Sequence, residues 1–543
     1  PPLLQLVLGR LSIADGVVRF EHPQFKSDFH ARIETRPGKA PDAPELQVRA
    51  AGTYAGQPLT AYFIGAALFA LREPEHPYPV LLSVTHGATR LRLEGTLLDP
   101  VHLGGANMNL RFEGADLSQL YLLTGVPLPP TAPYTLQGRI EYAQGKPGPS
   151  VYFKRFTGRV GSSDLSGDLA VQVGGPRLRI SGVMRSKNVL LADLGGLVGA
   201  TPGEPDAKGM TSAQKAEHDR QHANPRLLPD KPINLPKLRG ADFDVRYAAQ
   251  RLQSEKTPFD DIEAHLRIED GVLSLRPLSF GIGGGGIAAN LLLDGTQDPA
   301  RVEADADFRQ VDFGRVLREA TDFRGAGRID GRASLQARGN SVAALLGAGN
   351  GKLRLSMAGG DMSALLINLA GLDFGNALLS AMGIPSRADL RCMVADLNLR
   401  DGIVHTDTFL LDTTEANVVG TGTVNLKTEV VDYRVQTEPK TFNIGSVAAP
   451  INIRGPMKKP HIRPDTGSLA RRGTAAVVLG IIGTPLAALA ATVQLGTGKD
   501  VDCASLIKAV RNEAARLPRA QDIPAEQKPG ETAPGAAEGG KQK

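Results

Sequence analysis

The residue patterns that could support chemistry are few, and each lacks a partner that its chemistry requires. Residues 281–286 match the G-x-G-x-x-G pattern of a dinucleotide site, but an alternating strand follows where a helix N-terminus should meet the pyrophosphate. Residues 347–352 resemble a phosphate-binding loop that is one residue short, and Leu353 follows where Ser or Thr should hold magnesium. We interpret both segments as turns, and we expect no cofactor.

The histidines and cysteines do not indicate a metal site. His218 and His222 are four positions apart in a polar segment without a third ligand, which is typical of a solvated pair. Cys392 and Cys503 are the only cysteines, which excludes a disulfide scaffold and a cysteine-based zinc module. They form either one bridge in an oxidising compartment or two unpaired small apolar residues. No metal site is therefore predicted.

No catalytic centre emerges from the remaining sequence either. Neither the G-x-S-x-G turn of hydrolases nor the H-E-x-x-H pattern of metalloproteases occurs. Acidic residues are numerous, but no two of them are marked as an acid and base pair. We therefore do not expect an enzyme.

The elements around these segments are mostly strands. Apolar residues alternate with charged ones over residues 242–247, 262–268 and 431–435, which is typical of strands with one buried and one solvated face. A unit with Asp-Gly between two alternating runs recurs as LSIADGVVRF (11–20), LRIEDGVLSL (266–275) and LNLRDGIVHT (397–406). Asp-Gly favours tight hairpins. The prediction is a mainly β protein built on a long, curved antiparallel sheet with a few flanking α-helices.

Composition supports this interpretation. The chain of 543 residues has 62 Lys and Arg against 57 Asp and Glu, and this net charge of +5 is too small to indicate a nucleic-acid partner. It has 62 Gly and 38 Pro, which favours short strands and turns over a helical bundle. Length alone would suggest roughly three or four domains.

Several segments depart from the strand pattern. We predict helices over residues 311–320 and 361–382, a Pro-rich polar linker or loop over 201–236, and a disordered tail over 518–543. Residues 475–493 are apolar and long enough to span a membrane, but Gly480, Gly483 and Pro485 interrupt them. We favour a broken apolar helix that packs on the sheet or lies at a membrane interface.

The apolar faces of so many strands need a cover. A second sheet would make a sandwich or barrel, whereas a ligand would leave an open groove. A groove for acyl chains needs no specific polar anchor, so its pattern would be alternation without a motif. The residues alone leave both architectures open and favour the sandwich.

Two regions resemble the AsmA family of Gram-negative envelope proteins, which includes the AsmA-like and TamB-like proteins. The first comprises LLPDKPINLPKLRGADFDVRYAAQRL (227–252) and DDIEAHLRIEDGVLSLRPLSFGIGGGGIAANLLLDG (260–295). The second comprises FLLDTTEANVVGTGTVNLKTEVVDYRVQTEPK (409–440), APINIRGPMKKPHIRPD (449–465) and the later Asp502-Cys503-Ala504. Their order over residues 227–510 carries the resemblance, and the N-terminal part fits more loosely.

This resemblance implies a taco-like hydrophobic groove and a periplasmic protein held in the inner membrane by an N-terminal helix that is absent from this sequence. It implies the movement of phospholipids between the inner and outer membranes in support of outer-membrane assembly. The alternative is a non-enzymatic scaffold or chaperone that binds outer-membrane polypeptides by strand addition. Residues 475–493 would dock against the outer membrane or an envelope protein.

The predicted organisation has five parts: residues 1–200 and 237–470 form the groove, 201–236 link them, 471–517 form a hydrophobic helical element and 518–543 form the tail. The predicted lipid-binding residues are apolar positions of the groove strands. They are Ile262, Leu266, Ile268, Leu273, Leu275, Leu291, Leu293, Leu397, Leu399, Val424, Leu426, Val431, Tyr433 and Val435.

Overall fold

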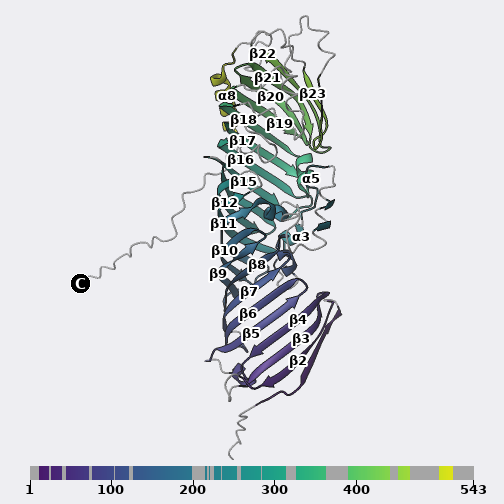
Figure 1. Cartoon of the computed structure of the whole chain (residues 1–543), viewed down its shortest axis with the longest axis vertical. Coiled ribbons are helices and arrows are strands. Elements are labelled where there is room, and N and C mark those ends of the chain that lie inside the picture. The colour runs from purple at the N-terminus through teal and green to yellow at the C-terminus, as the bar shows by residue number, and fades with distance from the viewer. Residues whose placement is uncertain are drawn as a thin grey trace, which may run out of the picture.

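A computed structural model shows one continuous sheet of 24 strands and few helices. The strands follow one another along the long axis of the molecule (Figure 1). The structure describes residues 11–23, 26–38, 44–72, 76–102, 104–121, 126, 128–197, 215–216, 219–220, 226–233, 235–253, 258–282, 284–312, 326–361, 389–440, 450–464 and 500–517.

Each strand pairs with the next strand in the chain. The first half contains β1 (Gly16–His22), β2 (Ser27–Arg36), β3 (Glu45–Tyr54), β4 (Gln57–Gly65), β5 (Tyr78–His86), β6 (Thr89–Leu98), β7 (Gly105–Gly114), β8 (Tyr134–Ala143), β9 (Ser150–Val160), β10 (Ser163–Gln172) and β11 (Leu178–Leu190). The second half contains β12 (Ala241–Gln253), β13 (Pro258–Glu269), β14 (Val272–Ile282), β15 (Gly285–Asp294), β16 (Arg301–Asp312), β17 (Ala326–Arg338), β18 (Asn350–Asp361), β19 (Asp389–Arg400), β20 (Ile403–Thr413), β21 (Ala416–Asn425), β22 (Val430–Pro439), β23 (Ile451–Pro456) and β24 (His461–Pro464). Among these strands, β1 and β24 each pair with a single neighbour, so the sheet is open.

The predicted antiparallel order holds at every junction but one. β11 and β12 are parallel, with Ile180 opposite Phe243 and Met184 opposite Tyr247. A parallel pair needs a long crossover, because the second strand must start at the opposite margin of the sheet from the end of the first. Residues 191–240 supply that connection, which includes the 3-10 helix η4 (Leu191–Leu197) and α3 (Leu235–Leu238).

The Asp-Gly turns form as predicted at two of the three positions. Asp270 and Gly271 have φ values of 52° and 82°, and Asp401 and Gly402 have values of 47° and 79°. Two consecutive positive φ values give a hairpin turn that matches the twist of its strands. The prediction is wrong at residues 11–20, where β1 starts at Gly16 and the main chain of Ile13 bonds to Thr35 of β2.

β-bulges keep the apolar residues on one face over these long strands. Arg155 and Gln310 are non-glycine residues with positive φ, and each lies in a bulged strand whose register shifts. Carboxylates on the neighbouring strands satisfy the displaced backbone N–H groups: Arg155 donates to Asp168 at 2.9 Å and Gln310 donates to Asp330 at 2.9 Å. Each bulge absorbs an extra residue, so the alternation continues beyond it.

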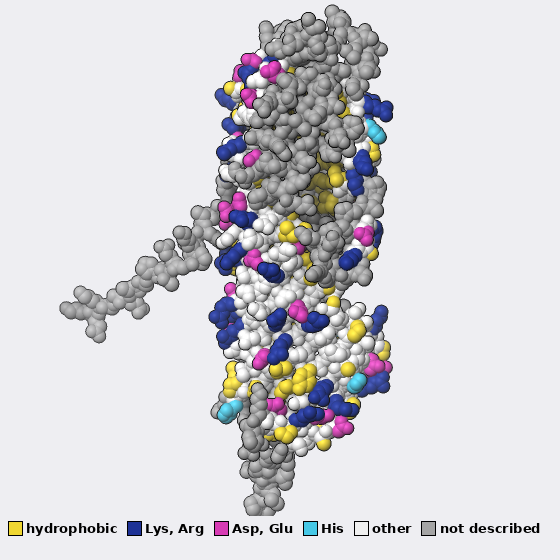
Figure 2. Space-filling model, viewed as in Figure 1, with side chains coloured by type: hydrophobic (Ala, Val, Ile, Leu, Met, Phe, Trp, Pro, Cys, Tyr) yellow, Lys and Arg dark blue, Asp and Glu magenta, His cyan; other side chains and the backbone are white. Residues whose placement is uncertain are grey.

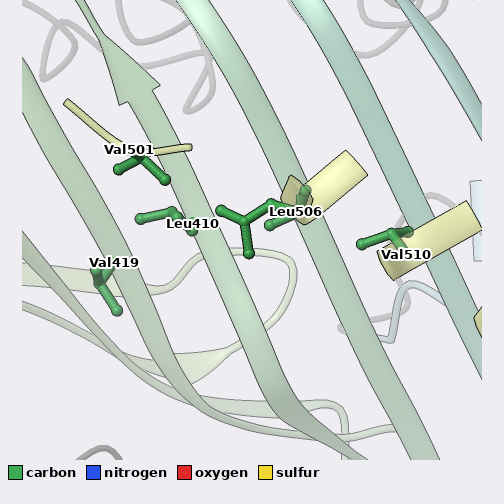
Figure 3. Close-up of a cluster of buried hydrophobic side chains, with 6 residues drawn as sticks. Leu410, Val419, Val501, Leu506 and Val510 are labelled. Atoms are coloured by element: carbon green, nitrogen blue, oxygen red, sulfur yellow. The ribbon is translucent and has the colours of Figure 1, made fainter. Parts of the chain in front are cut away.

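The C-terminal helix α8 (Cys503–Ala515) packs across β17, β18 and β19. Leu506 and Val510 of the helix join Val394, Leu410 and Val419 of the sheet in a buried apolar cluster with Val501 (Figure 3). A disulfide joins Cys392 of β19 to Cys503. This pairing resolves the two alternatives that the sequence left open.

Several predicted segments lie outside the described residues. They are 475–493, 518–543, most of 201–225, all of 361–382 except Asp361, and 313–320 of the helix expected over 311–320. That helix prediction is wrong at its start, because Val311 and Asp312 end β16. The first glycine-rich segment contains a turn as predicted, because Gly284 (φ 84°) lies between β14 and β15. The second runs from the last residue of α5 (Val342–Gly347) into β18 (Asn350–Asp361), so it connects a helix to a strand.

The turn at Gly402 should be sensitive to substitution. A Cβ atom there would lie 2.1 Å from the Gly347 carbonyl oxygen, whereas Gly359 also has positive φ (72°) but has no atom within 4 Å. We expect Gly402→Ala to lower the free energy of unfolding by about 3 kcal/mol and Gly359→Ala by about 1 kcal/mol. Denaturant titration measures both values, and equal losses would contradict the predicted backbone clash.

The disulfide should stabilise the C-terminal region. Cys392 and Cys503 are 111 residues apart, and closing a loop of that size is worth about 5 kcal/mol in the chain-entropy account. We expect Cys392→Ser with Cys503→Ser to lower the denaturant midpoint. A reductant should lower the midpoint of the native protein and leave that of the variant unchanged. A reductant-insensitive native protein would argue against the bond.

Candidate functional site

The most extensive feature of the sheet is an apolar face that runs across its strands in register. In the first half, directly paired residues form one row across β2 to β7, and paired residues in antiparallel strands point to the same face. The row is Ile33, Val48, Phe63, Leu82, Leu93 and Leu110. All six side chains are partly exposed. None of these six residues is among the predicted lipid-binding positions, although apolar and polar residues alternate in their strands.

A second row crosses the other half of the sheet. It runs from β12 to β22 through directly paired positions. Its members are Val245, Leu266, Leu275, Leu291, Ala304, Leu335, Gly351, Leu399, Val404, Val424 and Val431. Six of the predicted lipid-binding residues are in this one row, although they come from strands as far apart as β13 and β22.

The other predicted residues have different surroundings. Ile268, Leu273 and Leu293 form a parallel row, in which Ile268 and Leu293 are each only 7% exposed. Ile262, Leu397, Tyr433 and Val435 lie on the same face as these rows. Leu426 is in the turn between β21 and β22 rather than in a strand. Thirteen of the fourteen positions therefore share one face.

Residues 226–233 and 235–238, here called the strap, cover part of this face along one margin. Leu235 of α3 is buried in a cluster with Leu293, Val302, Ala337 and Leu345, and Leu273 and Leu291 pack against that cluster. The predicted residues at this margin are thus packed under the chain itself. The end of the predicted linker is therefore a structured part of the sheet margin.

A second cover lies over the middle of the sheet. The loop between β7 and β8 contains the 3-10 helix η3 (Leu117–Leu120). Asp116 caps its N-terminus, where the carboxylate accepts from the Ser118 N–H. Leu120 is buried against Leu136 and Phe156, and Leu117 and Leu128 pack around this cluster. The apolar face is thus roofed by its own loops at β8–β10 and at β14–β17, while the row across β2–β7 stays partly exposed.

The opposite face carries charged side chains in paired rows. Arg90 and Glu113 are directly opposite and 3.2 Å apart, and Asp432 and Arg454 are directly opposite and 2.8 Å apart. Charged side chains lie along both long margins of the molecule and also across the lower half of the view (Figure 2). Exposed pairs of this kind add little stability. Where helix α8 does not cover it, this face is therefore solvated.

Helix α8 changes this charged face locally. It buries Arg354 of β18 and Asp396 of β19, which are directly opposite and 3.3 Å apart. Burial raises the pKa of Asp396, and Arg354 opposes that rise. Arg332 also donates to the carbonyl of Ala514 at 3.0 Å, where a cation offsets the negative end of the helix. Helix α8 therefore lies on the face opposite the apolar rows.

The residues near the disulfide do not fit a metal ion. Cys392, Cys503 and Asp412 are the one trio in the described ranges whose ligand atoms lie close enough together. Both sulfur atoms are used in the disulfide, and the Asp412 carboxylate pairs with Lys440 and with Arg391. This cluster anchors the segment before α8, because Lys440 also binds Asp500 at 2.9 Å.

Comparison with known proteins gives the family. The AsmA family profile matches residues 5–437. The AsmA family protein YhjG of Escherichia coli (strain K12) is 33% identical over 516 residues, which are 93% of this chain and 75% of that protein. The chain belongs to the AsmA family. No solved structure matches it.

Membership in the AsmA family places this chain among envelope proteins. It agrees with the family resemblance noted in the sequence and with the open, curved sheet. Over the ranges that the structure covers, no helix has both the length and the apolar character needed to cross a membrane.

The strap is fixed at its start by one carboxylate. Glu429 is 5% exposed, and it accepts from the Leu227 N–H at 2.5 Å and from Arg226 at 2.9 Å. Burial acts to raise the Glu429 pKa, but the backbone N–H groups of Leu227 and Leu228 and the Arg226 side chain outweigh it and leave the pKa below its usual value.

This anchor should make the strap sensitive to acid. A lowered pKa in the folded state stabilises the fold above the unfolded pKa of about 4.3, and this stabilisation is lost as the pH falls through the lowered value. We expect Glu429→Gln to cost about 1–2 kcal/mol at pH 7 and progressively less as the pH falls below about 4.3. Unfolding titrations over this pH range measure the cost, with the exposed Glu94→Gln as control. A cost independent of pH would contradict this role.

Proposed function

We propose that this AsmA family protein carries phospholipids between the inner and outer membranes along its apolar face, without enzymatic chemistry. The observation that supports this most directly is the row from Ile33 to Leu110, which presents six partly exposed apolar side chains in unbroken register. An acyl chain lying across such a row replaces the missing cover, and each buried methylene contributes about 0.8 kcal/mol.

The mechanism is passive. Acyl chains bind through non-directional apolar contact, so they can slide from one strand to the next without breaking a specific bond. Head groups stay in water at the margins, where charged side chains lie (Figure 2). The lack of a catalytic constellation in the sequence is consistent with such a role.

Location in the periplasm follows from the same proposal. A disulfide between Cys392 and Cys503 is stable in an oxidising compartment such as the periplasm. Phospholipids are the proposed ligands, and the inner membrane is the proposed site of anchorage. The scaffold alternative uses the same apolar face to bind polypeptide, so the identity of the bound molecule separates the two.

Adjacent positions on β5 provide a matched test. Val84 pairs with Ala61 and Leu91 on the apolar face, whereas the next residue, Thr85, is exposed on the charged face opposite Arg90. We expect Val84→Asp to reduce bound phospholipid at least about tenfold, since a buried carboxylate without a partner is costly. Thr85→Asp should leave the amount unchanged. Val424→Asp tests the second row in the same way.

The measurement is native mass spectrometry with lipid extraction on protein purified from a Gram-negative host. Circular dichroism and the denaturant midpoint establish that each variant is folded. Near-stoichiometric phospholipid in the native protein that is lost in Val84→Asp supports the proposal. Co-purified peptide without lipid, or equal lipid in folded Val84→Asp and Thr85→Asp, would overturn it.

A further inference from the structure

The two edges of the sheet differ in how they are protected against pairing with another strand. β24 has four residues and ends at Pro464, and short strands and prolines are common protections of an edge. β1 has seven residues, pairs with β2 without a register shift and contains neither Lys nor Pro. Within the described chain, β1 is therefore the longer and more regular of the two edges.

β1 also exposes large apolar side chains on both of its faces. Val17 is 62% exposed, Val18 is 54% exposed and Phe20 is 43% exposed. Phe20 stacks on Phe29 of β2 with ring centroids 5.0 Å apart, so one side of its ring is covered. An edge with this composition gains apolar contact and backbone hydrogen bonds when another strand joins it.

The charges on β1 indicate what that strand is. Arg19 and Glu21 precede and follow Phe20 in the sequence and lie on the charged face. Their side chains are exposed, with 64% and 61% accessible. If two β1 strands pair antiparallel about Phe20, Arg19 of each copy lies opposite Glu21 of the other. The same register places the two Phe20 side chains opposite each other. The strand is therefore complementary to itself, as a two-fold interface requires.

We propose that β1 pairs antiparallel with β1 of a second copy of this chain, in the register centred on Phe20. Directly opposed residues share a face in an antiparallel pair, so the apolar faces of the two copies become one continuous face. The pairing goes beyond the proposed lipid carriage and does not depend on it. A seven-residue strand pair is small beside a standard interface, so the dimer should have a dissociation constant of about 10 µM.

Charge exchange tests the register. Arg19→Glu and Glu21→Arg each place like charges opposite each other twice in the dimer, so each should weaken dimerisation roughly tenfold. The double variant with both changes restores opposite charges and should restore the dimer. In the double variant, the Arg at position 21 lies directly opposite Asp28. In the native chain, Asp28 binds Arg19 at 3.0 Å. Sedimentation velocity over about 1–100 µM measures the constants.

Cross-linking locates the contact. Phe20→Cys should form a covalent dimer with a short bis-maleimide, because the two copies of position 20 lie opposite each other in this register. The reagent reacts at the introduced cysteine, since the native cysteines are paired in the disulfide. Val18→Cys should not form this dimer, since in this register the two copies of position 18 lie about 13 Å apart along the strands. Ile462→Cys on β24 is the control for the other edge.

The outcomes separate the possible occupants of the edge. Concentration-dependent dimers, rescue by the double variant and a Phe20→Cys cross-link support the proposal. A monomer at all concentrations, failure of the double variant to recover, or a cross-link only between Phe20→Cys and Ile462→Cys would overturn it. The last result would indicate head-to-tail filaments. Lipid content is measured in parallel, and its loss or presence bears on lipid carriage alone.

Discussion

The structure depends on one constraint: the strands must stay in the register that keeps their apolar residues on a single face. Side chains alternate with a period of two, so a slip of one residue would move every apolar side chain of a strand to the charged face. Bulges at Arg155 and Gln310 absorb extra residues, and Asp168 and Asp330 satisfy their displaced N–H groups. These local features allow many strands to share one face over the length of the molecule.

Among the described residues, two segments cover parts of the apolar face that results. The η3 loop roofs the middle of the sheet and the strap roofs one margin of the second half. Helix α8 lies on the opposite face, where it buries the pair of Arg354 and Asp396 and an apolar cluster around Val394. Both faces therefore contribute buried clusters to the fold. The side chains of the row from Ile33 to Leu110 are partly exposed.

The proposed lipid carriage requires an extended apolar face and no catalytic motif. Apolar burial is non-directional and scales with area, so a lipid-binding surface needs many alternating positions and no single indispensable side chain. The resemblance to the AsmA family accordingly lay in the order of whole segments rather than in a short motif. An edge strand such as β1 binds differently. The hydrogen bonds of its backbone N–H and C=O groups are directional, whereas the contacts of its apolar side chains are not.

The sequence by itself determined the strands, the Asp-Gly turns at 270–271 and 401–402, the apolar character of one face and the absence of a recognisable catalytic pattern. These properties are local, since they follow from alternation and from the φ values that Gly and Asp tolerate. Only the tertiary structure decided that β11 and β12 are parallel, that the strap covers Leu273 and Leu293, and that Cys392 pairs with Cys503. Each of these depends on contacts between residues far apart in the chain, and a period of two does not specify which strands or loops become neighbours.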